Sequence, residues 1–311
     1  MSKKIVVLSG GVGGARFLQG LVQVIPQNNI VVIGNTGDDE EFYGLHVSPD
    51  LDIVMYTLAG VVNEKQGWGY KNETYHTMEQ LSKLGNDGWF QLGDKDLATH
   101  IHRTNLLQKG KTISEVTEAL RTQFGLNIKL IPMSDQKVRT KIKTDHKVIS
   151  FQEYFVKNRA KDTVRAVTYY GSKIAKPAPA VLPAIMQAQA VLLAPSNPIV
   201  SIGTILSIPG IRDALRKTNA KIAAISPIIK GTTIKGPADK MMKNLGMEPS
   251  ALGIAKAYHD FLDVMIIDTQ DAALQKNIEK CNIKTFVTNT IMKDQQTKKL
   301  LAKTVLDSVR C

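Results

Sequence analysis

Two groups of carboxylates lie close together near the start of the chain. Residues 38–41 read Asp-Asp-Glu-Glu, and residues 48–52 read Ser-Pro-Asp-Leu-Asp. Four consecutive acids repel one another unless a cation or solvent lies between them. Carboxylates are ligands that Mg²⁺ selects, usually one or two of them with substrate phosphate and water. The spacing indicates a magnesium site with Asp38 and Asp50 as ligands. A solvated acidic loop, followed by a helix that Ser48 caps, is the alternative.

A glycine-rich segment, Gly10-Gly11-Val12-Gly13-Gly14, follows a short apolar run and precedes a helical pattern. Glycines let the backbone approach a ligand closely, and free N–H groups at a helix start attract anions. Gly11, Gly13 and Gly14 are therefore candidate phosphate-binding residues. The segment is not a dinucleotide fingerprint, because Arg16 stands where the third glycine would be, and it is not a Walker motif. A tight strand–helix turn without a ligand is the alternative.

Two later segments have the composition of phosphate or nucleotide contacts. Residues 195–198 read Pro-Ser-Asn-Pro, and residues 235–240 read Lys-Gly-Pro-Ala-Asp-Lys. Small hydroxyls, an amide and lysines near helix starts suit an anionic ligand, although ordinary turns would have the same composition. The candidate residues in these segments are Ser196, Asn197, Lys235 and Asp239.

Aromatic and histidine residues give weaker signals. Trp68 and Trp89 each stand beside a glycine, and such a residue is more often a core anchor than a stacking platform. Asp96, His100 and Arg103 share one face of a predicted helix. Pairing within that helix on a solvated face is the default interpretation, and the zinc-helix spacing is absent.

Short buried strands alternate with helical patterns along most of the chain. The predicted strands are residues 5–8, 30–33, 191–194, 222–225, 264–267 and 285–287. Continuous apolar runs are typical of a parallel sheet covered on both faces. We therefore predict an α/β protein with a doubly wound, mostly parallel, Rossmann-like sheet. Ligands bind outside the carboxyl ends of such strands, where the segments described above lie.

The regular alternation of short strands and helices is lost between residues 65 and 178. We predict a core domain of residues 1–64 and 179–311, with residues 65–178 forming an inserted mixed α/β lobe packed on it. Within the lobe, residues 138–143 and 164–169 read as strands and residues 151–156 as a short helix.

The net charge of +12 is unevenly distributed. Residues 1–100 carry 7 basic and 12 acidic side chains, a net of −5, whereas residues 101–250 carry 24 and 9, a net of +15. This asymmetry suits a cation next to a phosphate-bearing ligand better than a nucleic acid, and the aromatic content of 6% also disfavours nucleic-acid binding. Cys281 and Cys311 are expected to be free thiols, and no apolar run approaches the ~20 residues of a membrane span. We expect a cytoplasmic protein without nucleic-acid or membrane partners.

Nine segments together resemble the 2-phospho-L-lactate transferase family, across residues 5 to about 270. They are Ser9–Phe17, Asn35–Asp39, Ser48–Gly60, Gly67–Gly69, Leu92–Thr104, Pro132–Asp135, Ala194–Gly203, Ser226–Ile229 and Lys235–Met242. The resemblance implies transfer of a phospholactyl group, or phosphoenolpyruvyl in some members, from a guanosine-diphospho donor to the deazaflavin Fo. It also implies Mg²⁺, release of GMP, a role in coenzyme F-420 synthesis, and a homodimer.

The resemblance assigns roles to particular residues. Asp50 and Trp89 would lie at the deazaflavin, with Asn35 and Thr36 beside them. The acidic loop would hold the metal, and the segments around Ser196-Asn197 and Lys235–Lys240 would lie near the guanylate. Asp50 would orient or deprotonate the hydroxyl of Fo that attacks phosphorus. The chain departs from the family at Thr204, where members have proline, and at Lys230, where they have a small residue.

Two other classes compete with this interpretation. A non-catalytic relative on the same fold, binding a nucleotide-sugar and regulating carbon metabolism, is the closest. Residues 38–41 lack the glycines of that group. A nicotinamide- or S-adenosylmethionine-binding enzyme is disfavoured by the missing third glycine.

Overall fold

The computed structural model describes residues 4–310, and its centre is a seven-stranded sheet in the order β14-β13-β10-β9-β1-β2-β5. Every neighbouring pair in this sheet is parallel. The predicted doubly wound parallel sheet is therefore confirmed, and the six predicted strands agree with the observed bounds to within one residue at each end. The strands are β1 (Ile5–Ser9), β2 (Ile30–Gly34), β5 (Lys129–Pro132), β9 (Ala190–Leu193), β10 (Lys221–Ile225), β13 (Val264–Asp268) and β14 (Lys284–Thr288).

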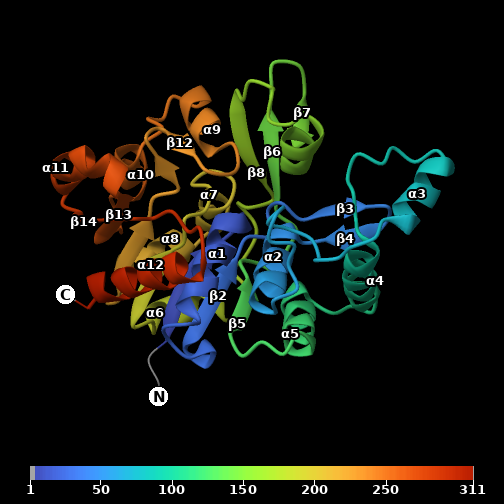
Figure 1. Ribbon diagram of the computed structural model, residues 1–311, viewed down its shortest axis with the longest axis horizontal. Coiled ribbons are helices and arrows are strands. Elements are labelled where there is room, and N and C mark those ends of the chain that lie inside the picture. The colour runs from blue at the N-terminus through green and yellow to red at the C-terminus, as the bar shows by residue number, and fades with distance from the viewer. Residues whose placement is uncertain (1–3, 311) are drawn as a thin grey trace.

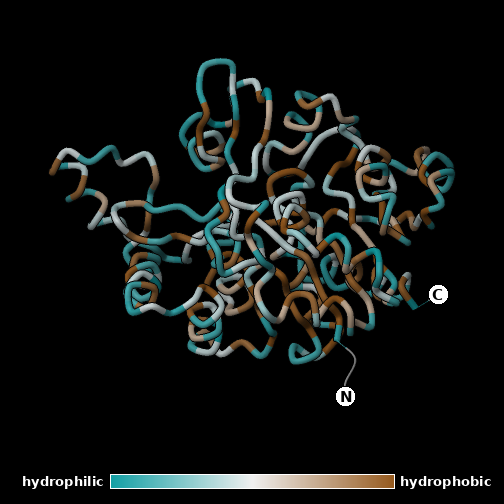
Figure 2. The backbone as a smooth tube through the Cα atoms, turned by 180° about the vertical axis from the view of Figure 1, so that it is seen from behind, coloured by the Kyte–Doolittle hydropathy of each residue, from teal (hydrophilic) through white to brown (hydrophobic). Residues whose placement is uncertain are grey.

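Helices cover both faces of the sheet (Figure 1). Alternate residues of each strand point to opposite faces, so that Val7 belongs to one apolar core and Val6 and Leu8 to the other. The first core is covered by α1 (Gly11–Leu21), α2 (Pro49–Leu58), α5 (Ile113–Gln123) and α12 (Gln295–Ser308). The second is covered by α6 (Val181–Met186), α7 (Ile202–Leu206), α8 (Ile211–Lys217), α9 (Ala238–Asn244), α10 (Ala251–Tyr258) and α11 (Gln275–Glu279). The strands are mainly hydrophobic along their length, and the outlying loops are mainly hydrophilic (Figure 2).

The predicted lobe of residues 65–178 is not a single unit. β5 lies inside this range but pairs with β2 at the edge of the main sheet, and α5 packs on the same sheet face. Pro132 and Lys129 flank only two aliphatic residues in β5, so the strand gives little apolar signal. The prediction that the lobe is a separate insertion is therefore wrong for this segment.

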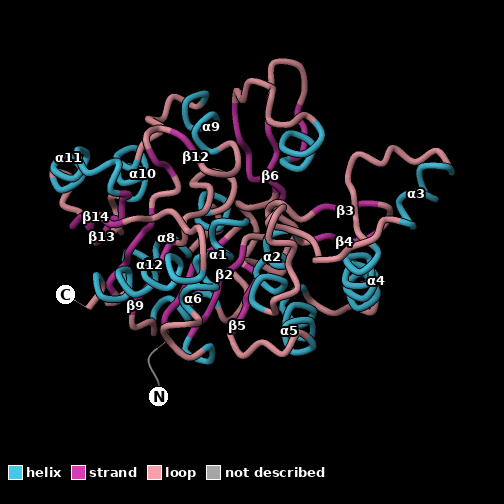
Figure 3. Tube along the Cα trace, viewed as in Figure 1, coloured by secondary structure: helices cyan, strands magenta, loops and turns pink. Residues whose placement is uncertain are grey.

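The rest of the range, together with residues 40–47, forms two outlying parts (Figure 3). One contains the hairpin of β3 (Glu40–Phe42) and β4 (Leu45–Val47) with α3 (His76–Lys83) and α4 (Asp94–Gln108), around a small apolar cluster that includes Phe42 and Leu97. The other is an antiparallel sheet of β7 (Val148–Ser150), β6 (Arg139–Lys143) and β8 (Ala166–Tyr170), with a π-helical turn at Glu153–Lys157. Ile142 and Tyr154 of this part join the main core, so it is packed on the sheet as predicted.

The remaining elements are short. They are the 3₁₀ turns Gln27–Asn29 and Thr269–Leu274 and the hairpin of β11 (Ile228–Ile229) and β12 (Thr232–Thr233). The chain runs from β1 to β2 on one side and places β9 on the other, so the strand order reverses beside β1. In open α/β sheets this switch point, at the carboxyl ends of the strands, is where ligands bind.

Candidate active site

The glycine-rich loop after β1 binds a carboxylate of the chain itself. The Gly11 amide donates to Asp50 Oδ1 over 2.8 Å, at the N-terminus of α1. The Gly10 amide donates to Ser196 Oγ over 3.0 Å, and that hydroxyl donates back to the Gly10 carbonyl. Gly11 has φ +63°, which a glycine adopts without strain. The amide that the sequence predicted to be free for phosphate is therefore occupied by Asp50.

Gly13 and Gly14 allow α1 to approach the loop that follows β9. A Cβ on Gly13 would collide with the Pro195 carbonyl oxygen, and one on Gly14 would collide with the Ser9 hydroxyl. These two glycines bring the start of α1 against the segment that carries Ser196. Their predicted contact with phosphate stays a prediction, whereas their packing role is visible.

Asn35 joins two of the predicted metal ligands. Its side-chain amide lies 2.9 Å from Asp50 Oδ2, 3.2 Å from Asp38 Oδ2 and 3.2 Å from the Val200 carbonyl. The side-chain oxygen of Asn35, Oδ1, accepts from the Gly37 backbone amide, so the side-chain amide group of Asn35 cannot rotate freely. Asn35 is fully buried. The residue predicted to contact the deazaflavin therefore also holds the Asp38 and Asp50 carboxylates together.

Burial raises the pKa of both Asp38 and Asp50. Burial raises the pKa of Asp50 to about 6, against the hydrogen bonds from Asn35 and Gly11 that lower it. Burial and the neighbouring Asp50 raise the pKa of Asp38 well above its ordinary value. Two such groups favour either a shared proton or a bound cation.

Several buried oxygens at this point have no hydrogen-bond partner. They are Asp38 Oδ1, Asp39 Oδ1, Thr36 Oγ1 and Ser9 Oγ. Unpaired buried oxygens are costly unless a ligand satisfies them. Within residues 4–310, no group of three or more His, Cys, Asp or Glu side chains forms a ready-made metal cage. Mg²⁺ usually takes only one or two carboxylates and completes its shell with phosphate and water, so these oxygens fit that ion.

Asp39 is held from the β3–β4 hairpin. Its Oδ2 accepts from the Ser48 hydroxyl at 2.9 Å and lies 3.0 Å from His46 Nε2. Ser48 stands at the N-cap position of α2, but its side chain does not cap that helix. The alternative in which the Ser48 side chain caps α2 is therefore not observed, because its hydroxyl donates to Asp39 in the acidic loop.

The segment after β9 is built around backbone turns. Asn197 Oδ1 accepts from the amides of Ile199 and Val200, which fixes the Val200 carbonyl that Asn35 contacts. Thr204, fully buried, donates to the same carbonyl over 2.7 Å and lies 3.3 Å from the Thr140 hydroxyl of β6. The Thr204 hydroxyl therefore links α7 to β6, and the proline that the family resemblance leads us to expect at this position would make neither contact.

Two predicted nucleotide contacts, Lys235 before α9 and Asp239 in its first turn, have different surroundings. Lys235 Nζ donates to the Gln66 carbonyl over 2.9 Å and lies 5.8 Å from the centre of the Trp68 ring. Burial and Arg16 lower the pKa of Lys235. Asp239 instead accepts from the Thr233 hydroxyl over 2.8 Å, tying α9 to β12. Lys230 has φ +50° in the turn between β11 and β12, where its amide donates to Asp271.

Trp89 is partly buried and packs against the outlying apolar cluster. Its ring centre lies 5.4 Å from that of Phe42 and 5.4 Å from Lys157 Nζ. Phe42 is three residues beyond Asp39, about 10 Å along an extended strand. Trp89 is therefore partly buried against this cluster, and its predicted contact with the deazaflavin stays a prediction.

The sequence did not identify a buried charge network behind the acidic loop. Arg103 pairs with Asp52 Oδ1 and donates to His100 Nδ1 over 3.0 Å, and Tyr56 donates to Asp96 Oδ1 over 2.7 Å. Arg103 and His100 are 2% and 1% exposed, so the predicted solvated face is wrong. Asp52 was the sign of this network in the sequence, because it lies two residues after Asp50 on a helix whose apolar side must be buried.

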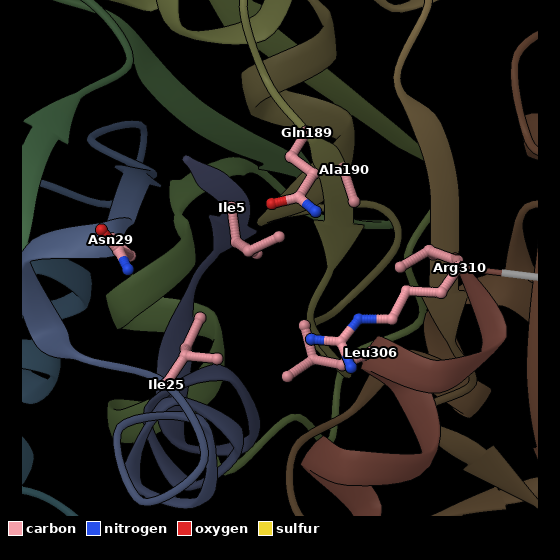
Figure 4. Close-up of a pocket in the computed structure, with 8 residues that line it drawn as sticks. Ile5, Ile25, Asn29, Gln189, Ala190, Leu306 and Arg310 are labelled. Carbon is pink, nitrogen blue, oxygen red and sulfur yellow. The ribbon is translucent and has the colours of Figure 1, made fainter. Parts of the chain in front are cut away.

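A cavity of about 170 Å³ lies at the opposite end of the sheet (Figure 4). Ile5 and Ala190, at the amino ends of β1 and β9, line it together with Arg310. A five-residue strand separates it from the acidic loop by about 16 Å. This cavity does not belong to the candidate site.

The fold and the site define a class of protein: an α/β protein of Rossmann-like topology with a buried cluster of carboxylates at its switch point. The family model described as 2-phospho-L-lactate transferase CofD matches residues 5–307. This chain belongs to that family and is a transferase.

Named relatives support the assignment over nearly the whole chain. A phosphoenolpyruvate transferase of Streptomyces griseus is 46% identical, covering 98% of this chain and 98% of that protein. A 2-phospho-L-lactate transferase of Methanocaldococcus jannaschii is 41% identical, covering 97% of each. A solved Bacillus halodurans structure has a TM-score of 0.65 at 14% identity, covering 98% of this chain and 100% of that one, which shows the fold alone. No helix in residues 4–310 is long and apolar enough to cross a membrane.

Proposed function

We propose that the chain transfers a phospholactyl or phosphoenolpyruvyl group from a guanosine-diphospho donor, such as lactyl-2-diphospho-5'-guanosine, to the deazaflavin Fo. GMP is released, and the reaction is a step of coenzyme F-420 synthesis. The observation that carries the proposal is the buried Asp38–Asp50 pair, bridged by Asn35 at the switch point. It lies in a chain whose relatives are named for transfer of these two groups.

Asp50 is the proposed catalytic residue. A carboxylate with a pKa of about 6 is a stronger base than an ordinary aspartate and is still mostly ionised at pH 7. It accepts the proton of the terminal ribityl hydroxyl of Fo as that oxygen bonds to the phosphorus nearer the lactyl or enolpyruvyl group. The bond from this phosphorus to the bridging oxygen breaks, and GMP leaves with that oxygen. Such a displacement needs positioning and charge neutralisation more than covalent catalysis.

Asp38 and Asp50 would hold Mg²⁺, because both carboxylates are buried, the Asn35 amide contacts both, and Asp38 Oδ1 has no hydrogen-bond partner. Bound there, the ion would neutralise negative charge on the diphosphate of the donor. Thr36 supplies a buried, unpartnered hydroxyl next to these carboxylates for a contact with the acceptor.

The donor nucleotide is proposed to lie toward Ser196 and Lys235. Arg16 and Lys235 repel one another and form no ion pair with a carboxylate of the described residues. Uncompensated cations of this kind favour an anion such as a diphosphate. Trp68, 53% exposed beside Lys235, offers an apolar ring to the same ligand.

A non-catalytic, nucleotide-sugar-binding protein on the same fold is the second candidate. The related UPF0052 fold is shared at only 14% identity, whereas named transferases are 41–46% identical. The paired carboxylates also favour catalysis, since binding alone does not require two strained acids. A homodimer, which the family resemblance implies, and a cytoplasmic location, which the composition favours, belong to the same proposal.

The test is turnover with both donors. The purified chain is incubated with Fo, Mg²⁺ and either the lactyl or the enolpyruvyl diphosphoguanosine, and products are separated by chromatography. We expect GMP and phosphorylated Fo in equal amounts with one donor. Folded protein that binds these ligands but releases no GMP with either donor would support the regulatory alternative.

A further inference from the structure

Residues 46 to 52 run from β4 into α2 and contact two different parts of the molecule. Ser48 and Asp50 point into the acidic cluster, where they contact Asp39, Gly11 and Asn35. His46 and Asp52, one step further out on either side, are instead held by α4. Ser48 and Asp50 therefore lie between two anchor points, His46 and Asp52, which α4 holds in place.

One buried guanidinium joins these anchor points. Arg103 pairs with the Asp52 carboxylate through one terminal nitrogen. Its other terminal nitrogen lies 3.4 Å from the His46 carbonyl and 3.0 Å from His100 Nδ1. The neighbouring Thr104 hydroxyl accepts from the His46 amide over 2.8 Å. A planar fork of donors can satisfy all of these acceptors together, which a single ammonium cannot.

These contacts of Arg103 influence the positions of two carboxylates of the site, Asp50 and Asp39. Asp52 lies in the first turn of α2 with Asp50, so fixing one fixes the other. His46 presents its ring to Asp39 Oδ2 at 3.0 Å, so holding its backbone also holds that contact. We propose that Arg103 is a positioning residue, which sets Asp50 and Asp39 through Asp52 and His46 without touching a substrate. The proposal rests on the proposed transferase function for its kinetic consequence, but not for its structural one.

The test replaces the guanidinium of Arg103 by an ammonium, which keeps the positive charge. Arg103→Lys retains an ion pair with Asp52 but loses the simultaneous contacts to His46 and His100. The matched control is Arg212→Lys, because Arg212 makes a comparable fork to Asp260 and the Ala257 carbonyl, far along the sheet from the acidic cluster. Both variants are compared with the unaltered chain by thermal melting, steady-state kinetics and the NMR shift of the Gly11 amide.

We expect Arg103→Lys to lower kcat at least tenfold while both KM values stay within about threefold. Its melting temperature should fall further than that of Arg212→Lys, because the Arg103 side chain is 3% exposed and that of Arg212 is 34% exposed. Kinetics are therefore compared at temperatures where both variants stay folded, and the kcat of Arg212→Lys should stay within twofold. The Gly11 amide, which donates to Asp50, should shift toward its position in Asp50→Ala in the first variant only. An unmoved Gly11 resonance, or a kcat loss equal to that of Arg212→Lys, would overturn the positioning role. Absence of turnover in the unaltered chain would refute the proposed function alone, and the Gly11 resonance would still decide the role of Arg103.

Discussion

Replacing Asp50 by asparagine should stabilise the fold while removing activity. Burial raises the pKa of Asp50 from 3.8 to about 6, so the folded state binds the proton more tightly than the unfolded chain does. Ionisation of Asp50 therefore costs stability, with no cost below pH 4, a growing cost between pH 4 and 6, and the full cost above. A shift of this size corresponds to about 3 kcal/mol.

Asparagine keeps the shape of the side chain without its charge. Its oxygen can still accept from Gly11, but its amide then faces the Asn35 amide, and one lost hydrogen bond costs about 1–1.5 kcal/mol. The net gain at pH 7 is about 1.5–2 kcal/mol, or roughly 2–4 °C in melting temperature.

The assay is thermal and urea unfolding of Asp50→Asn and the unaltered chain between pH 4.5 and 8, with EDTA present. Asp260→Asn serves as a control of opposite sign. Although burial raises the pKa of Asp260, hydrogen bonds from Arg212 and Arg216 hold it at about 2, so that variant should lose stability. If Asp50→Asn is no more stable than the unaltered chain at pH 7, the carboxylate pair is not strained and the argument for a cation there fails.

Three further predictions follow from the same contacts. Gly13→Ala should destabilise the chain by about 1–3 kcal/mol in urea unfolding, because the added Cβ meets the Pro195 carbonyl. The control Gly88→Ala, whose Cβ meets only a flexible side chain at 3.4 Å, should change stability by less than about 0.5 kcal/mol. Equal effects of the two substitutions would contradict the packing of Gly13 against Pro195. Mg²⁺ at 100 times its Kd should stabilise the unaltered chain by about 2.7 kcal/mol in melting experiments, and an equal effect on Asp38→Asn would place the ion elsewhere. Trp89→Leu should weaken Fo binding roughly three- to tenfold in a fluorescence titration, whereas unchanged affinity would leave Trp89 a core residue only.

The main sheet was predictable because its strands are continuously apolar. Runs such as Ile5–Leu8 can only be buried on both faces, and this fixes the sheet type without any knowledge of its partners. β5 was not predicted, because a strand of four residues with a lysine and a proline at its ends contains no continuous apolar run. Its place in the sheet is set by contacts with β2 and α5, which are far away in the sequence.

The site was predictable in its parts but not in its pairings. Loops after parallel strands converge, so the grouping of Asp38, Asp50 and Ser196 follows from the strand order. That Gly11 binds Asp50, and that Asn35 bridges two carboxylates, depends on side-chain geometry that residue types do not reveal. Arg103 was misjudged for the same reason, since its partner Asp52 lies on a different helix.

The most direct test of the account is turnover by Asp50→Asn beside the control Asp260→Asn. GMP release is followed with Fo, Mg²⁺ and whichever of the two donors the unaltered chain uses. The account predicts at least a hundredfold loss of kcat in Asp50→Asn, roughly the 10²–10⁴-fold contribution of a general base, at undiminished melting temperature. Asp260→Asn should retain its turnover at temperatures where it stays folded. Activity of folded Asp50→Asn close to that of the unaltered chain would contradict the assignment of the active site.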